Sequence, residues 1–152
     1  MQFDAIDKKI LALLQVDASL SNAELGERVA TSPASCWRRV KNLEAAGVLG
    51  PIVRLLNPEA IGRGVNVLCN VRVRSHSRET RSAFEDFVRE RPEVMECYSM
   101  SGDWDYQLRV VASDVPDYER FLMRVLLEHP SVGGASSHFA LSQTKYTTAL
   151  PV

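Results

Sequence analysis

Cysteine is scarce in this sequence, and the few cysteines present form no recognisable pattern. Cys36, Cys69 and Cys97 are odd in number and far apart, and no C-x-x-C pair occurs. This arrangement argues against a disulfide framework and against a zinc site. Each cysteine lies in an apolar stretch, so we expect three small core residues in a reducing compartment, the cytoplasm.

Long apolar runs are also missing. No stretch approaches the roughly 18 apolar residues needed to cross a bilayer. The N-terminus lacks the basic segment followed by an apolar segment that marks a signal peptide. We therefore expect a cytoplasmic protein with no membrane partner.

Neither sign of charge is in excess. The chain has 18 basic and 19 acidic residues, which gives a net charge of −1. Without a global basic field, any nucleic-acid binding must come from a local patch. The histidines, His76, His129 and His138, are too isolated to predict a metal site. We recognise no catalytic Ser/His/Asp or Cys/His set, so no catalytic residue and no cofactor are predicted.

The first 50 residues contain the start and stop signals of three short helices. Asp4 is a good N-cap for the first, and Ser21-Asn22-Ala23-Glu24 has the capping-box pattern for the second. Ser32-Pro33 begins the third helix, which is expected to end near Gly47. Two short helices joined by a tight break, packed on a preceding helix, are typical of a helix-turn-helix.

The third helix has two faces. The apolar face is expected to point inward and comprises Cys36, Val40 and Leu43. The outward face comprises Ser35, Arg38, Arg39 and Asn42, flanked by Lys41. Arginine suits phosphates and guanine edges, asparagine suits adenine edges, and Ser32 at the helix N-terminus suits a phosphate.

This outward face predicts contact with double-stranded DNA in the major groove. The alternative is an ordinary solvated helix face. Trp37 is expected to pack in the core or at a hinge rather than against a base.

Beyond residue 50 the pattern changes from short helices to alternating strands and helices. Ile52–Leu56 is expected to form a strand, the wing or hinge of a winged helix, and the linker continues to residue 64. Further strands are predicted at 65–74, 95–101, 106–112 and 135–141, with amphipathic helices around Phe84 and Phe121.

The resulting order is β-α-β-β-α-β. The predicted class is α+β, a winged helix-turn-helix followed by a ferredoxin-like domain. We assign the DNA-binding domain to residues 1–50, the wing and linker to 51–64 and the second domain to 65–152. Two helices would cover one sheet face and leave the other for a partner, so at least a homodimer is expected.

Several stretches together resemble the Lrp/AsnC, or feast/famine, family of transcriptional regulators. They are Ser21–Leu25, Ser32-Pro33 with Cys36, Arg39-Val40, Leu43-Glu44, Gly47, Leu55–Pro58 and Ser101–Tyr106. The resemblance covers nearly the whole chain in order. It implies a DNA-binding regulator that works without catalysis, with a hinge strand and an effector-binding domain. It also implies an amino-acid effector and dimers that gather into larger rings, often octamers.

The turn from Gly102 to Tyr106 is the candidate effector site. Gly102 permits unusual backbone angles, and Asp103 and Asp105 place carboxylates where one would hold an α-ammonium group. In the resembling family this turn lines the effector site together with Tyr106, and a facing strand supplies polar groups, here Ser136, Ser137 or His138. The alternative is a plain Gly-Asp hairpin turn. The small, serine-rich strand leaves the identity of the effector open.

Two further functions remain as alternatives. Siroheme decarboxylases share features of this fold, although the sequence offers no residue set for that chemistry. A regulator without effector, acting as an architectural DNA-binding protein, is the other alternative.

Overall fold

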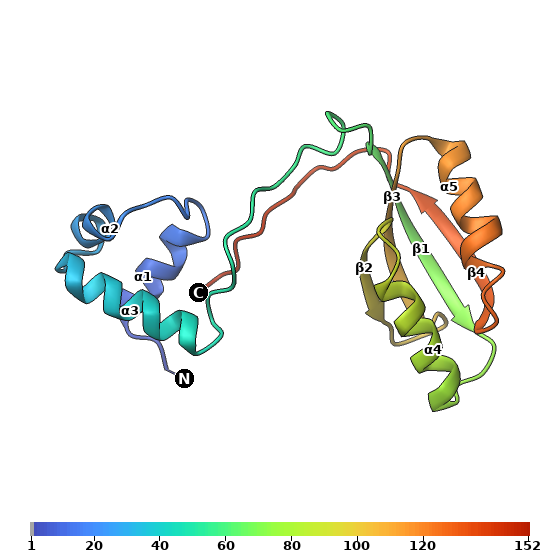
Figure 1. The fold of residues 1–152 in the computed structure, drawn as a ribbon, viewed down its shortest axis with the longest axis horizontal. Coiled ribbons are helices and arrows are strands. Elements are labelled where there is room, and N and C mark those ends of the chain that lie inside the picture. Colours follow the sequence, from blue (N-terminus) through green and yellow to red (C-terminus); the bar gives the residue numbers. More distant parts are fainter. Residues whose placement is uncertain (1) are drawn as a thin grey trace. The chain divides into compact units, whose positions relative to one another are not determined.

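The chain divides into two compact units. The computed structural model describes residues 2–152 (Figure 1). The first unit contains the chain up to Arg54 together with Thr144–Val152, and the second contains Leu55–Gln143.

The N-terminal unit holds the helices α1 (Ala5–Leu14), α2 (Asn22–Val29) and α3 (Pro33–Ala45). Each begins at the residue that the sequence predicts. The Asp4 side chain accepts from the backbone N–H groups of Ile6 and Asp7, and Ser21 and Glu24 form a reciprocal capping box. Ser32 accepts from the N–H of Ser35, and Pro33 occupies the first turn of α3, where its missing N–H has no intrahelical partner to lose.

A small apolar core joins these helices. Its buried members are Ile10, Leu11, Leu25, Val29, Cys36 and Leu43. The break between α2 and α3 is tight, and Ala30 adopts a left-handed conformation with φ of 56°. A Cβ on Gly26 would lie 2.7 Å from the carbonyl oxygen of Thr31. Glycine is therefore required where α2 turns toward α3.

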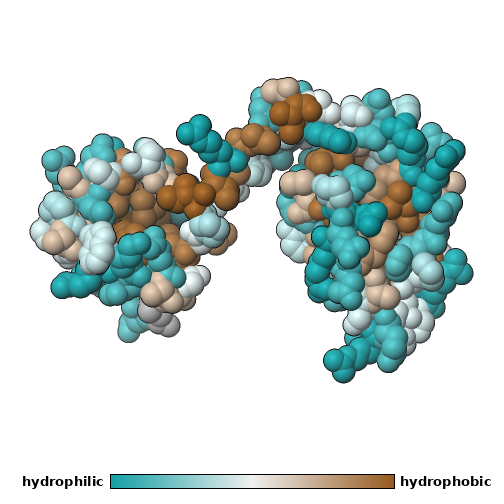
Figure 2. All heavy atoms as spheres, viewed as in Figure 1, coloured by the Kyte–Doolittle hydropathy of each residue, from teal (hydrophilic) through white to brown (hydrophobic). Residues whose placement is uncertain are grey.

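The prediction of a strand at Ile52–Leu56 is wrong. Residues 51–57 form no strand in the described chain. Four apolar side chains stay exposed there, Ile52, Val53, Leu55 and Leu56, and Figure 2 shows apolar side chains along the connecting segment. An alternating pattern predicts a strand only where a neighbouring strand accepts and donates hydrogen bonds, and no neighbour is paired here. The expected wing is absent from residues 2–64.

The second unit has the predicted β-α-β-β-α-β order. Its elements are β1 (Val65–Val73), α4 (Arg78–Arg89), β2 (Val94–Ser99), β3 (Tyr106–Ala112), α5 (Val115–Phe121), the π-helical turn η1 (Leu122–Leu126) and β4 (Val132–Phe139). The sheet order is β2-β3-β1-β4 and every pair is antiparallel. This confirms the ferredoxin-like prediction, although β2 and β4 begin and end earlier than expected.

One face of the sheet carries the core of this unit. Alternate residues of β1 and β3 pack with Phe84, Val88, Tyr118, Phe121 and Leu126 of the helices (Figure 1). The opposite face, which we call the open face, carries polar side chains of β1 and β3 such as Asn70, Arg72 and Gln107. Cys69 lies in the core as expected, whereas Cys97 of β2 is exposed, so the expected burial of Cys97 is wrong.

Candidate functional site

The exposed face of α3 is the first candidate site. Arg38, Lys41 and Asn42 are exposed, while Ser35 is only partly so. Cys36 and Leu43 are buried and Val40 packs partly against them, as the sequence predicts. The helix therefore presents cationic and amide groups on the side opposite its apolar residues.

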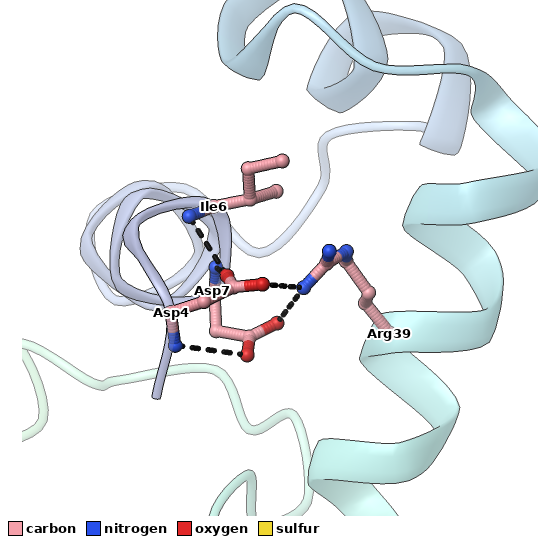
Figure 3. A network of polar contacts seen from close by, with 4 residues as sticks. All are labelled: Asp4, Ile6, Asp7 and Arg39. Atoms are coloured by element: carbon pink, nitrogen blue, oxygen red, sulfur yellow. Dashed lines mark hydrogen bonds and ion pairs between the residues drawn. The ribbon is translucent and has the colours of Figure 1, made fainter. Parts of the chain in front are cut away.

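Arg39 lies at the margin of this face and is only partly exposed. Its guanidinium donates to Asp4 at 2.8 Å and to Asp7 at 2.6 Å, which ties α3 to the first turn of α1 (Figure 3). Hydrogen bonds to Asp7 and Asp4 raise the pKa of Arg39. The hydrogen bond from the Asp7 N–H, and then the one from Arg39, lower the pKa of Asp4. The expected outward position of Arg39 is wrong because two carboxylates of α1 draw it between the helices.

Trp37 lies at one margin of the outward face, one turn before Lys41. Its side chain is 55% exposed, so the expectation of a packed core or hinge residue is wrong. Trp37, Arg38 and Lys41 follow the helical spacing of one stripe. Sequence reasoning missed this stripe because Trp37 was assigned to the interior by residue type alone.

The two cations of this stripe differ in whether they form an ion pair. Lys41 pairs with Glu44 at 2.7 Å, whereas Arg38 forms no ion pair within residues 2–152. Arg38, Arg39 and Asn42 also line a shallow depression beside Asp7 and Leu43. Ser32 caps the helix through its hydroxyl at 3.2 Å from the Ser35 nitrogen. Arg38 of the stripe can contact phosphates or guanine edges, and Asn42 beside the stripe can contact adenine edges.

The turn between β2 and β3 is the second candidate site, and Asp105 holds it to the end of β1. One carboxylate oxygen accepts from the Val73 N–H at 2.8 Å, and the other lies 2.8 Å from His76 Nε2. Burial raises the pKa of Asp105, but the Val73 hydrogen bond and the His76 contact outweigh it and lower the pKa overall. Asp105 is thus engaged by the protein itself.

The other residues of the turn lie nearer solvent. Gly102 has φ of +107°, which favours glycine, and Asp103 is exposed. Arg72 donates to the carbonyl oxygen of Asp103 at 3.0 Å and lies 4.9 Å from the centre of the Trp104 ring. Arg72 at the end of β1 therefore holds the backbone of Asp103, whose carboxylate is exposed.

Tyr106 does not face this site. Its ring is 3% exposed and packs on Phe84, and its hydroxyl donates to Glu85 at 2.7 Å. The expected effector contact of the Tyr106 side chain is therefore wrong, because the strand alternation turns it into the core.

The serine-rich strand does not meet the turn within this chain. Ser137 points to the core and shares a hydrogen bond with Tyr118. Ser136 and His138 pair with Asn70 and Leu68 of β1, on the open face. The turn instead contacts β1 from the β3 side, at Val71 and Val73.

The structure adds Arg72 and His76 to the turn, and sequence reasoning missed both. The signal for Arg72 was present, because it is an outward-facing charged residue near the end of an alternating strand. His76 follows β1 in an irregular loop, where no period indicates its direction.

Two separate parts of the chain match known domain families. Residues 3–44 match the AsnC-type helix-turn-helix domain. Residues 66–150 match the Lrp/AsnC ligand binding domain.

Curated relatives match the whole chain. A DNA-binding transcriptional activator of Escherichia coli K12, DecR, is 41% identical over 149 residues, which are 98% of each protein. A glutamate uptake regulatory protein of Zymomonas mobilis is 38% identical over 151 residues, covering 99% of this chain and 92% of that protein.

Two solved structures have nearly the same fold. A transcriptional regulator of Neisseria meningitidis in complex with L-Met superposes with a TM-score of 0.95 at 39% identity, over 99% of this chain and 97% of that one. An AsnC family regulator of Agrobacterium tumefaciens gives 0.93 at 43% identity, over 98% and 97%.

Proposed function

This chain belongs to the Lrp/AsnC family of DNA-binding transcriptional regulators, and we propose that it reads its operator with the α3 stripe of Trp37, Arg38 and Lys41. The stripe occupies the second helix of the helix-turn-helix, which is the helix that enters the major groove in this motif. Asn42 and Ser35 lie at the edge of the same face. Arg39 acts indirectly by fixing α3 on α1.

The observation that carries this proposal is the difference in ion pairing between two adjacent arginines. Arg39 is held by Asp4 and Asp7, whereas Arg38 is exposed without an ion pair in the described chain. A guanidinium that the protein does not neutralise is available to phosphate or guanine. Since the net charge of the chain is −1, such a local patch must supply the attraction.

DNA selected from genomic fragments by the intact protein provides the test. Arg38→Ala is compared with Arg78→Ala, an exposed arginine on α4, by fluorescence anisotropy across a salt series. We expect Arg38→Ala to weaken binding by about 1–3 kcal/mol if it reads a base, or to reduce the salt slope by about one unit if it contacts phosphate only. Arg78→Ala should bind as the wild type. Equal binding by both variants would contradict the placement of α3.

We propose that an amino acid binds at the turn of Gly102–Asp105 and changes assembly or DNA affinity. Asp103 is free to hold an ammonium group, and Arg72 lies beside it to hold a carboxylate. Asp105 positions the turn. Ser136 and His138 would join the site only from another copy of the chain. The L-Met complex of the similar Neisseria regulator supports an amino acid as ligand class.

A thermal-shift screen of the twenty amino acids tests this sensor role, because a ligand that binds only the folded state raises its melting temperature. We expect at least one amino acid to stabilise the wild type and Asp86→Asn, an exposed control on α4, but not Asp103→Asn. If no amino acid changes the melting temperature, sedimentation or operator affinity, the effector-independent alternative holds.

We further propose that the protein works as a homodimer, with octamers as the larger assembly. The polar open face of the sheet has no covering element within residues 55–143, which supports pairing through this face. Analytical ultracentrifugation with and without amino acid measures the states. Two recognition helices per dimer predict a pseudo-palindromic operator with half-sites about one helical turn apart.

The proposed role requires no catalysis. The curated relatives described above are named as a transcriptional activator and as a regulatory protein. Visible absorption spectra after incubation with siroheme test the enzymatic alternative, and conversion of siroheme would overturn our proposal.

A further inference from the structure

A second cavity lies in the ligand-binding domain, away from the turn of Gly102–Asp105. Its volume is about 290 Å³, just below the range of about 300–1,000 Å³ for small-molecule sites. It lies between α5 with η1, the end of β3 and the residue that precedes β2. The apolar part of its lining comprises Val110, Val111, Ala112, Phe121 and Val125.

The rim of this cavity carries charges of both signs. Arg120 and Arg124 stand one turn apart on α5 and η1, and Glu93 lies across from them. Arg120 pairs with Asp117 at 3.0 Å, whereas Arg124 has no ion pair within residues 2–152. A guanidinium beside an apolar floor can donate two parallel hydrogen bonds to a carboxylate.

Glu93 supplies the opposite charge. Its carbonyl oxygen accepts from the Val111 N–H at 2.9 Å, which fixes its backbone to β3. Its side-chain atom Oε2 is sequestered from solvent and has no hydrogen-bond partner in the described chain. Buried carboxylate oxygens normally accept hydrogen bonds, so this atom can accept one from a ligand.

The backbone gives an independent sign of function at the same place. Arg124 and Val125 belong to the π-helical turn Leu122–Leu126. Single π-helical turns occur frequently at functional sites.

We propose that this cavity binds a small zwitterion, an α-amino acid with an apolar side chain, as a second ligand site. Arg124 holds the carboxylate, Glu93 Oε2 accepts from the ammonium group, and the side chain lies on Val110, Ala112 and Phe121. A simple anion would face Glu93 and a simple amine would leave Arg124 unpaired, so the two charges together favour a zwitterion.

The cavity also touches the segment that enters the domain. Asp117, which lines it, accepts from Arg63 at 3.1 Å, and Arg63 directly precedes Gly64 and β1. A ligand that competes with Asp117 for Arg120 would change this contact. The site would therefore influence the linker independently of the proposed effector turn.

Hydrogen–deuterium exchange of the intact protein tests the inference. Each of the twenty standard amino acids is added at millimolar concentration, and the amides of residues 107–112 and 118–126 are followed. We expect protection by at least one amino acid with an apolar side chain. Its N-acetyl and carboxamide derivatives, which lack the ammonium or the carboxylate, should give no protection.

Variants separate this site from the proposed effector site. Glu93→Gln and Arg124→Gln should each weaken the amino acid's effect on these amides by about tenfold or more, which is about 1.4 kcal/mol, while Glu119→Gln, an exposed control on α5, behaves as the wild type. Asp103→Asn should abolish protection of residues 100–106 and leave the cavity responsive.

The inference is overturned if no amino acid protects residues 107–112 and 118–126. Protection that survives in Glu93→Gln and Arg124→Gln, or equal protection by the blocked derivatives, also overturns it. Protection of residues 100–106 alone supports the proposed effector turn and refutes the cavity. Protection of residues 107–112 and 118–126 alone supports the cavity and refutes the proposed effector turn.

Discussion

Two adjacent arginines of α3 have different surroundings although they are one residue type. Arg39 links α3 to α1 through Asp4 and Asp7, while Arg38 extends from the same helix into solvent. Helical spacing placed both on an outward face, and it predicted the buried Cys36 and Leu43 correctly. It could not separate the two arginines, because neighbouring positions differ by about 100° and the approach of α1 decides which one is covered.

Replacement of Arg39 should therefore lower the stability of the N-terminal unit rather than remove a direct contact with DNA. We expect Arg39→Gln to lower the free energy of unfolding by about 1 kcal/mol, because a networked ion pair on a partly exposed surface contributes on that scale. Arg38→Gln, with no ion pair to lose, should change it by less. Urea unfolding measures both, and equal stability of the two variants would contradict the structural role of Arg39.

Asp105 predicts a pH-dependent contribution to stability. Its pKa lies below the ordinary 3.8 because the Val73 N–H and His76 outweigh the effect of burial. The unfolded chain therefore takes up this proton at higher pH than the folded one. The stabilisation is fully present above the unfolded pKa and is lost as pH falls through the folded pKa.

Asp105→Asn removes this ionisation while keeping the shape of the side chain. We expect the difference between the urea midpoints of wild type and variant to be largest above about pH 5 and to shrink as the pH falls below 4. Asp86→Asn is the control, because Asp86 is exposed and has no capping role. Asp114 is unsuitable because it caps α5. A difference independent of pH would contradict the role given to the Asp105 charge.

At the level of helices and strands, local signals determined what the sequence could predict. The N-caps Asp4, Ser21 and Ser32 fixed three helix starts, because each satisfies backbone N–H groups within its own first turn. The segment Ile52–Leu56 lacked such a local criterion. Its alternation resembles a strand, but pairing depends on a partner far away in sequence or in another chain.

Gly26 shows a requirement that the sequence did not reveal. It lies inside α2, where glycine is unfavourable by itself, yet a Cβ there would meet the Thr31 carbonyl oxygen at 2.7 Å. We expect Gly26→Ala to lower the free energy of unfolding by about 1–3 kcal/mol, because the α2–α3 turn must open to admit the methyl group. It should also weaken DNA binding by displacing α3.

Gly50→Ala provides the matched control, because an added Cβ there has no atom within 4 Å. Circular dichroism melts and anisotropy on selected DNA measure both effects. If Gly26→Ala folds as stably as Gly50→Ala, the close approach at this turn is not limiting.

For the whole molecule, the two units depend on different kinds of sequence information. The core of the second unit follows from alternating strands and helical stripes, which the sequence displays directly. The C-terminal segment does not follow from any such pattern. Leu150 donates to Gln15 at 2.6 Å and its carbonyl oxygen accepts from the same side chain at 3.1 Å, so one glutamine at the end of α1 holds the tail in the first unit.

The segments that join the units should be the first to be cut by trypsin. Arg54 lies in the unpaired stretch 51–57 and Lys145 lies in the tail, and both are exposed outside helices and strands. Most other basic residues belong to helices or strands, where cleavage requires local unfolding. Arg63 is also less exposed to attack because Asp117 holds it.

Cleavage after Arg54 and Lys145 should therefore precede all other cuts and leave fragments that match the two units. Mass spectrometry of a time course identifies the order. Arg54→Gln and Lys145→Gln should each remove one early cut, and Gln15→Leu should accelerate cleavage after Lys145 because the tail loses both hydrogen bonds. Early cleavage within α3 or β1 instead would mean that the connecting segments are covered, as they would be if the apolar residues of 52–56 were buried by another copy of the chain.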